Sequence, residues 1–171
     1  MFNKKEKCQK IELLYNTYKR LMYKEAFDIL KEKGLAEDAV HQSFVKILKY
    51  RDDIGEIEDI KTKNFLMVVC RNSAINLYNQ NKKDDKIYLD DDKNVDKEDT
   101  TGIVIDHESV RKVVGAIEEL PVIYRDTLLL EKVHGYNANE ISELLDISVE
   151  AVYKRSSRAR NLLIKALKDN K

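Results

Sequence analysis

Residues 119–163, ELPVIYRDTLLLEKVHGYNANEISELLDISVEAVYKRSSRARNLL, contain the clearest helix signals of the chain. Pro121 suits the first turn of a helix, because its missing N–H is not needed there. Asn137, with Glu140 three residues later, forms a variant of the capping box and predicts a short helix. Ser148 can cap a further helix that continues toward the end of the chain. The stretch therefore predicts a short helix, a turn and a long helix.

The last of these helices is basic: residues 149–171 hold seven basic and two acidic side chains. A short helix, a turn and a longer basic helix form the helix-turn-helix arrangement, whose second helix offers cations to phosphates and polar donors to base edges. The candidate DNA-binding residues are Tyr153, Lys154, Arg155, Arg158 and Arg160. On the pattern alone, a solvated face of a terminal helix is an equally good interpretation.

Helical periodicity also covers the first half of the chain. Apolar residues recur at three- and four-residue steps from Ile11 to Leu30, and we expect Gly34 to stop this helix. A second helix is predicted with Glu37 and Asp38 in its first turn, where acidic side chains complement the helix dipole. A polar loop and a third helix running to about residue 83 follow, and a fourth precedes Pro121 in the second half. The predicted fold class is all-α.

The charges divide the chain into three parts, although 31 basic and 31 acidic residues give no net charge. Residues 84–108 hold ten acidic and three basic side chains and no sustained periodicity, which is typical of a linker. We therefore expect two small helical domains, 8–83 and 109–171, joined by the acidic linker 84–108. Each flanking block is long enough to hold a helical core.

Several function classes find no support in the sequence. The longest apolar run has six residues, against about 20 for a membrane span, and no signal peptide is predicted. The two cysteines and three histidines lack metal-ligand spacing, so we expect no metal site, no disulfide and a reducing cytoplasm. Cys70 lies on or beside an apolar stripe and is predicted to be buried. The sequence holds neither a nucleophile next to a base nor a Gly-rich phosphate loop. Nothing in it therefore indicates an enzyme or a cofactor.

Three stretches together resemble bacterial sigma factors of the extracytoplasmic-function (ECF) type. They are AEDAVHQSFVKILKY (36–50), NFLMVVCRNSAINLYNQNKK (64–83) and residues 119–163, in this order and with the acidic segment between the last two. The resemblance implies that the first domain is sigma region 2 and the last is sigma region 4. It also implies the function: directing core RNA polymerase to specific promoters and assisting promoter melting.

The resemblance assigns two surfaces to region 2. Asp38, His41 and Gln42 stand where the family docks on the clamp helices of the polymerase β′ subunit; Asp38 fits the family pattern, and the other two depart from it. Asn72 stands where the family contacts a flipped base of the minus-ten element, a role that suits an amide able to donate and accept. The full minus-ten set is Arg71, Asn72, Asn76, Asn79, Lys82 and Lys83.

In region 4 the resemblance implies readout of the minus-thirty-five element as duplex DNA. It places Lys154 and Arg158 at base edges and Arg155 at phosphate. Implied partners are core polymerase (β′ clamp helices and β flap), promoter DNA and an anti-sigma factor, often membrane-anchored, which would hold the cytoplasmic protein at the membrane.

One alternative stays open at this point: a free-standing helix-turn-helix regulator whose front helices form a dimer. Symmetry distinguishes the two hypotheses. A dimeric regulator binds a palindrome with half-sites about one helical turn apart, whereas a sigma factor is monomeric and binds two dissimilar elements.

Overall fold

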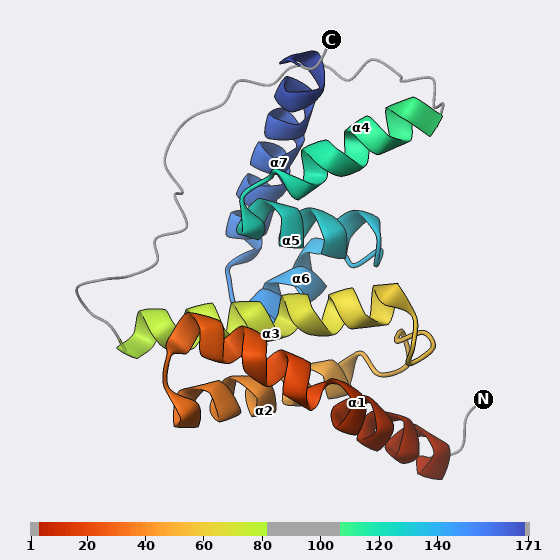
Figure 1. The fold of residues 1–171 in the computed structure, drawn as a ribbon, viewed down its shortest axis with the longest axis vertical. Helices are drawn as coiled ribbons and strands as arrows, with labels where there is room; N and C mark the ends of the chain where they lie inside the picture. The colour runs from red at the N-terminus through yellow and green to blue at the C-terminus, as the bar shows by residue number, and fades with distance from the viewer. Residues whose placement is uncertain (1–3, 82–106, 170–171) are drawn as a thin grey trace. The chain divides into compact units, whose positions relative to one another are not determined.

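The structure is a computed structural model that describes residues 4–81 and 107–169. Within these ranges every regular element is a helix, which confirms the predicted all-α class (Figure 1). The helices are α1 (Lys4–Leu30), α2 (Lys33–Lys49), α3 (Ile60–Asn81), α4 (His107–Glu118), α5 (Val122–Lys132), α6 (Ala138–Leu145) and α7 (Val149–Asp169).

The described helices fall into two compact units. Helices α1, α2 and α3 form the first unit, and α4, α5 and α7 belong to the second together with the beginning of α6. The predicted linker, 84–108, lies outside the described residues except for His107 and Glu108, which begin α4. The domain boundaries drawn from the sequence stay a prediction.

In the first unit each of the three helices packs against the other two. Helix α1 buries a stripe at four-residue steps, because residues four apart share one helix face. Fully buried side chains from all three helices meet in this core: Leu14, Met22, Ala26, Ala36, Ile47, Leu66 and Val69. The core therefore fixes both the polar face of α2 and the polar positions of α3.

The end of α1 differs from the sequence prediction. The helix ends at Leu30, and Lys31 takes a positive φ of 56° while its N–H donates to the Phe27 carbonyl at 2.9 Å. Lys31 thus makes the left-handed cap for which glycine is usual. Gly34 instead lies in the first turn of α2, so the predictions that it stops α1 and that Glu37 and Asp38 lie in the first turn of α2 are wrong.

The segment between α2 and α3, residues 50–59, is tied to α1 by two side chains. The Tyr18 hydroxyl donates to the Ile57 carbonyl at 2.6 Å, and the Lys10 ammonium donates to the Ile54 carbonyl at 2.5 Å. Ile54 is itself buried. These contacts satisfy loop carbonyls that no helix ladder could satisfy.

Cys70 lies in the middle of α3 and is fully buried, as the sequence predicted. Its thiol donates to the Met22 carbonyl at 3.3 Å. Burial raises the pKa of the Cys70 thiol to about 12, while a hydrogen bond with Ser43 acts in the opposite direction. The thiol is therefore a packing group of the first unit and not a reactive one.

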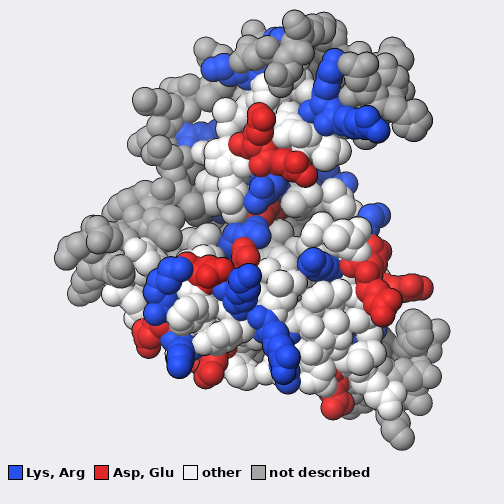
Figure 2. Space-filling view, in the orientation of Figure 1, with Lys and Arg blue, Asp and Glu red and all other residues white. Residues whose placement is uncertain are grey.

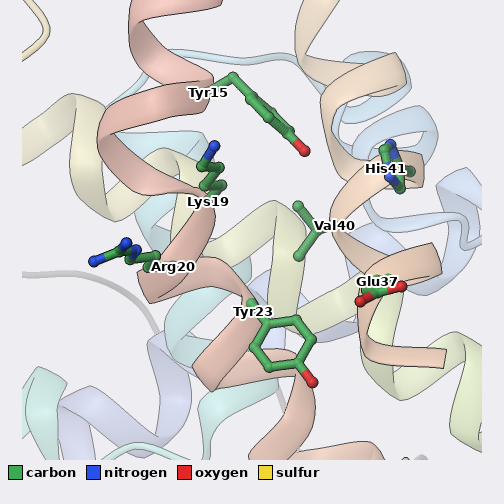
Figure 3. Close-up of a pocket in the computed structure, with 7 residues that line it drawn as sticks. All are labelled: Tyr15, Lys19, Arg20, Tyr23, Glu37, Val40 and His41. Carbon is green, nitrogen blue, oxygen red and sulfur yellow. The ribbon is translucent and has the colours of Figure 1, made fainter. Parts of the chain in front are cut away.

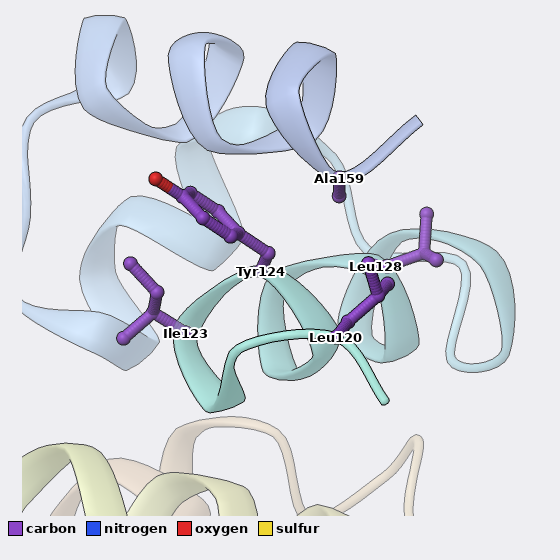
Figure 4. Close-up of a cluster of buried hydrophobic side chains, with 5 residues drawn as sticks. All are labelled: Leu120, Ile123, Tyr124, Leu128 and Ala159. Atoms are coloured by element: carbon purple, nitrogen blue, oxygen red, sulfur yellow. The ribbon is translucent and has the colours of Figure 1, made fainter. Parts of the chain in front are cut away.

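The second unit is organised around α5 and α7. Leu120 and three α5 side chains pack with Ala159 of α7 in one buried cluster: Leu120, Ile123, Tyr124, Leu128 and Ala159 (Figure 4). Ile117 of α4 and Leu163 of α7 cover this cluster. One side of α7 is thereby fixed, which leaves its other side for interactions outside the unit.

Candidate nucleic-acid interface

The cap of α6 forms as the sequence predicted. The Asn137 side-chain oxygen accepts from the N–H groups of Asn139 and Glu140 at 2.9 and 3.1 Å. The Glu140 carboxylate accepts from the Asn137 N–H at 2.7 Å. This reciprocal pair satisfies N–H groups that the first turn of a helix leaves without partners.

The turn into α7 also has a local cause. Asp146 adopts a positive φ of 52°, and the Ser142 hydroxyl donates to the Ile147 carbonyl at 2.6 Å. Ser148 then caps α7, since its hydroxyl oxygen accepts from the Ala151 N–H at 3.1 Å. A short helix, a tight turn and a capped long helix are thus present in the predicted order, as a helix-turn-helix requires.

Three of the five candidate residues of α7 lie on its exposed side. Tyr153 is 63% exposed, and the Lys154 side chain is 59% exposed. Lys154 pairs with Glu150 one turn earlier at 3.5 Å, an exposed pair that contributes little to stability and leaves the ammonium accessible. Arg160 is exposed, although its Nε donates to the Ser156 carbonyl at 3.2 Å.

Arg155 and Arg158 lie deeper. Arg155 is only 5% exposed, because its neighbours at helical spacing, Val152 and Ala159, belong to the buried side of α7. In this conformation Arg155 does not present its guanidinium to a phosphate, and its predicted phosphate contact stays untested. Arg158 is half-buried, and its Nη1 donates to the Tyr124 hydroxyl at 3.3 Å.

Glu131 of α5 adds an acidic group on the side facing α7. Burial alone would raise its pKa, but hydrogen bonds from Lys132 and Ser156 and the charges of Lys132 and Arg160 outweigh burial. The pKa of the Glu131 carboxyl therefore lies below its usual value. The carboxylate therefore stays ionised at neutral pH.

On α3 the predicted minus-ten residues separate into two groups. Asn72 is 3% exposed, and its amide donates to the Val68 carbonyl at 2.9 Å, so it lies in the core of the first unit. Arg71 donates through Nε to the Glu25 carboxylate of α1 at 2.5 Å. Asn76 and Asn79 are partly exposed. The other two predicted residues, Lys82 and Lys83, lie outside the described residues.

The three predicted polymerase-binding residues lie together on the exposed face of α2. Asp38, His41 and Gln42 are all exposed. The same face continues into Val45 and Leu48, which are 63% and 41% exposed. An apolar stripe of this kind beside polar residues is typical of a protein-binding surface.

A pocket of about 270 Å³ opens between α1 and α2 next to His41 (Figure 3). Tyr15 projects from α1 toward α2, and its ring lies 6.5 Å from the His41 ring and 5.0 Å from the Phe44 ring, measured between centroids. The Lys19 ammonium lies 5.3 Å from the Tyr15 ring centroid. The full lining is Tyr15, Lys19, Arg20, Tyr23, Glu37, Val40 and His41.

Sequence reasoning missed the α1 side of this pocket and the contact of Tyr124 with Arg158. The α1 residues were assigned to an amphipathic helix, whose polar and aromatic positions give no sign of which partner helix they meet. Tyr124 of α5 packs its ring in the buried apolar cluster. Its hydroxyl partner lies 34 residues away, and no local pattern links the two.

Charges of both signs are interspersed on the face drawn in Figure 2. Among the residues that the structure describes, no group of His, Cys, Asp and Glu side chains could hold a metal ion. A search of the same residues finds no helix long and apolar enough to span a membrane.

Comparison with known proteins gives a consistent result. Residues 111–163 match the family described as Sigma-70, region 4. The ECF RNA polymerase sigma factor SigX of Bacillus subtilis (strain 168) is 23% identical in an alignment that covers 90% of this chain and 81% of the relative. The ECF RNA polymerase sigma factor SigM of the same organism is 28% identical over 144 residues, covering 84% and 86%.

A solved structure is also similar: the sigma factor RpoE in complex with the anti-sigma factor NepR from Bartonella quintana. It is 17% identical with a TM-score of 0.41, over 98% of this chain and 99% of that chain. The resemblance predicted from the sequence is confirmed by the family match and by the two relatives.

Proposed function

We infer that this chain is an RNA polymerase sigma factor of the ECF type. The similarity to two such sigma factors extends over most of the chain, and residues 111–163 match sigma-70 region 4. The observation that carries the inference is the capped helix-turn-helix of α6 and α7, which lies inside the region 4 match up to residue 163 of α7. The chain acts without catalysis of its own, as an adaptor that brings core polymerase to promoter DNA.

We propose that the second unit reads the minus-thirty-five element through α7. The helix presents Tyr153 and Lys154 on its exposed side, and a Lys or Arg side chain in the major groove can bind the acceptor edge of guanine. Arg158 supplies a second base contact, and Arg160 contacts phosphate or the helix carbonyls. Base contacts specify the sequence, and phosphate contacts position the helix.

In the first unit, α2 supplies the proposed contact with core polymerase. Asp38, His41 and Gln42 face the β′ clamp helices, and the exposed Val45 gives the contact an apolar anchor. The pocket beside His41 extends this surface onto α1, where Lys19 and Arg20 favour a partner carboxylate. A charged rim around an apolar centre is the usual composition of a specific protein interface.

The proposed minus-ten contact belongs to α3. Arg71, Asn76 and Asn79 are at least partly accessible, whereas Asn72 is bonded to the Val68 carbonyl. If Asn72 binds a flipped base, its amide exchanges this internal bond for one to the base. We propose that capture of the melted strand is coupled to this exchange, so strand opening is the step that needs a rearrangement of the first unit.

The remaining proposals concern the cellular location of the protein and its regulation. A protein that binds core polymerase acts in the cytoplasm, where the polymerase is. An anti-sigma factor that covers the exposed face of α2 would compete with polymerase for the same residues. The β flap is the proposed polymerase contact of the second unit.

Size-exclusion chromatography with bacterial core RNA polymerase tests the function. We expect a stable one-to-one complex with the monomeric chain, and we expect the Asp38→Ala, Gln42→Ala double variant to weaken it. A dimer that ignores polymerase and binds a palindromic duplex alone would overturn the sigma assignment and support the dimeric regulator. Light scattering on the same column gives the mass of each species.

Two further variants assign roles to the two units. Arg158→Ala is expected to abolish use of promoters that depend on the upstream element and to leave polymerase binding intact. Asn72→Ala is expected to spare duplex binding and to impair strand opening, measured by permanganate reactivity of promoter thymines. Loss of polymerase binding in Arg158→Ala would contradict this division of roles.

A further inference from the structure

Arg158, one of the proposed base-reading side chains, is held by a buried tyrosine of another helix. Its Nη1 donates to the Tyr124 hydroxyl at 3.3 Å. Tyr124 lies in the first turn of α5 and is only 7% exposed, whereas Arg158 is half-buried. The bond therefore joins a core residue of α5 to a residue at the edge of the exposed side of α7.

Tyr124 is fixed in place by its surroundings. Its ring rises from α5 toward α7 within the cluster that includes Leu120 and Leu128 (Figure 4). Its backbone N–H donates to the Pro121 carbonyl at 3.0 Å. Ala159, the residue directly after Arg158, belongs to the same cluster. The phenol oxygen is thus a fixed acceptor for the guanidinium at the end of the Arg158 side chain.

A rigid acceptor matters for a long, flexible side chain. Arginine loses much rotamer freedom when it is immobilised on a base, and a contact made before binding reduces that loss. The guanidinium has five N–H donors in a planar fork, and a bidentate bond to guanine uses two of them. A bond from Nη1 to the Tyr124 hydroxyl helps to set the plane of the fork.

We propose that Tyr124 is a positioning residue that orients the Arg158 guanidinium toward the acceptor edge of a guanine in the upstream element. The inference rests on the proposed function of the second unit. Lys154 offers a contrast, because its paired carboxylate, Glu150, lies on the same exposed helix surface and fixes nothing against the core. Arg158 is therefore expected to discriminate between bases more sharply than Lys154.

The test uses the full chain bound to core polymerase and a promoter fragment selected by that holoenzyme. Tyr124→Phe removes the hydroxyl and keeps the ring in the cluster. We expect the preference for the selected upstream element over one with a single changed guanine pair to fall by about three- to tenfold, the usual effect of one lost hydrogen bond. Affinity for unrelated DNA should not change.

Two controls separate positioning from a general loss of structure. Tyr136→Phe removes another buried tyrosine hydroxyl from the same unit and should leave the preference unchanged. In the Arg158→Ala background, Tyr124→Phe should cause no further loss, because there is no guanidinium left to orient. Thermal unfolding of each variant checks that the second unit stays folded.

An unchanged preference in Tyr124→Phe, or an equal loss in the presence and absence of Arg158, would overturn the inference. If Arg158→Ala itself leaves the preference unchanged while the holoenzyme still selects promoters, Tyr124 has nothing to orient, and the inference falls while the sigma function stands. If the wild-type chain gives core polymerase no promoter selection at all, the proposed function falls and takes this inference with it.

Discussion

Helices α3 and α7 both carry predicted DNA-binding residues, but these residues differ in how far they are exposed to solvent. Helix α3 packs against both α1 and α2, and its central amide, Asn72, is 3% exposed. Helix α7 packs on α4 and α5 along one side, and Tyr153 on its other side is 63% exposed. The proposed reading surface of the second unit is thus already exposed, whereas the proposed contact of Asn72 with a base requires a rearrangement of the first unit.

The largest expected effects come from the two cores. Leu128→Ala in the second unit and Met22→Ala in the first should each lower the free energy of unfolding of their own unit by about 2–5 kcal/mol, the range for such cavities. Hydrogen exchange read separately for α1–α3 and α4–α7 measures this. Simultaneous loss of protection in both units from either change would show that the two units unfold as one cooperative body.

The next effect concerns the preformed surface of α7. Lys154→Ala should weaken binding of the holoenzyme to its upstream element by about 1–3 kcal/mol, because a good side-chain contact to a base edge has that value. Fluorescence anisotropy on labelled duplex gives the number. Glu150→Ala, which removes only the exposed ion-pair partner, is the matched control and should not weaken binding. Equal weakening in both variants would contradict a direct role for Lys154.

Asn72→Ala tests the closed surface of α3. Because the Asn72 amide donates to the Val68 carbonyl inside the core, its loss should lower the stability of the first unit by about 0.5–1.5 kcal/mol, even without DNA. Urea denaturation followed by circular dichroism measures this. Asn79→Ala, at a partly exposed position of the same helix, should have a smaller effect. A larger loss of stability in Asn79→Ala than in Asn72→Ala would show that the Asn72 side chain does not stabilise the core.

Cys70 gives a probe of whether α3 rearranges. Because burial raises the pKa of the Cys70 thiol to about 12, very little of it is thiolate near neutral pH. In a Cys8→Ser variant, alkylation by iodoacetamide should therefore be slow in the native protein and fast in urea. Faster alkylation in the open promoter complex would support a rearrangement of α3, and complete protection there would argue against it.

The smallest expected effect belongs to Glu131. Its pKa lies below the ordinary value, so the carboxylate contributes stability above the unfolded-state pKa, near 4.3, and loses it as the pH falls through the folded-state pKa. Glu131→Gln should lower stability at pH 7 by no more than about 1 kcal/mol. The difference from wild type should vanish in acid. A difference that persists at pH 3 would mean packing, and not charge, is responsible.

Much of the second unit could be predicted because its determinants are local. The Asn137–Glu140 cap and the Ser148 cap each act within three residues, and both form as expected. The end of α1 could not be predicted in the same way. Lys31 takes the left-handed conformation in place of Gly34, a choice that depends on how α1 and α2 must pack.

The predicted binding residues show where spacing alone is insufficient. The DNA-binding candidates of α7 all lie on one basic helix, but the sequence does not show where the buried stripe of that helix ends. Spacing alone therefore places Arg155 among the exposed candidates, although its side chain is buried. The role of Asn72 comes from the family resemblance. Such a resemblance implies a function for a residue but does not say whether its side chain is buried. The hydrogen bond between Tyr124 and Arg158 joins residues 34 positions apart in the chain. It depends on how α5 packs against α7, which no local sequence pattern gives.

Run-off transcription with bacterial core polymerase and a pool of random promoter fragments tests most directly whether this chain is a sigma factor. We expect core polymerase to give specific transcripts only when this chain is added, with two dissimilar elements shared by the selected fragments. The transcripts should disappear with Arg158→Ala when the upstream element is needed. No new transcripts, despite a folded chain and active core polymerase, would contradict the assignment of this chain as a sigma factor.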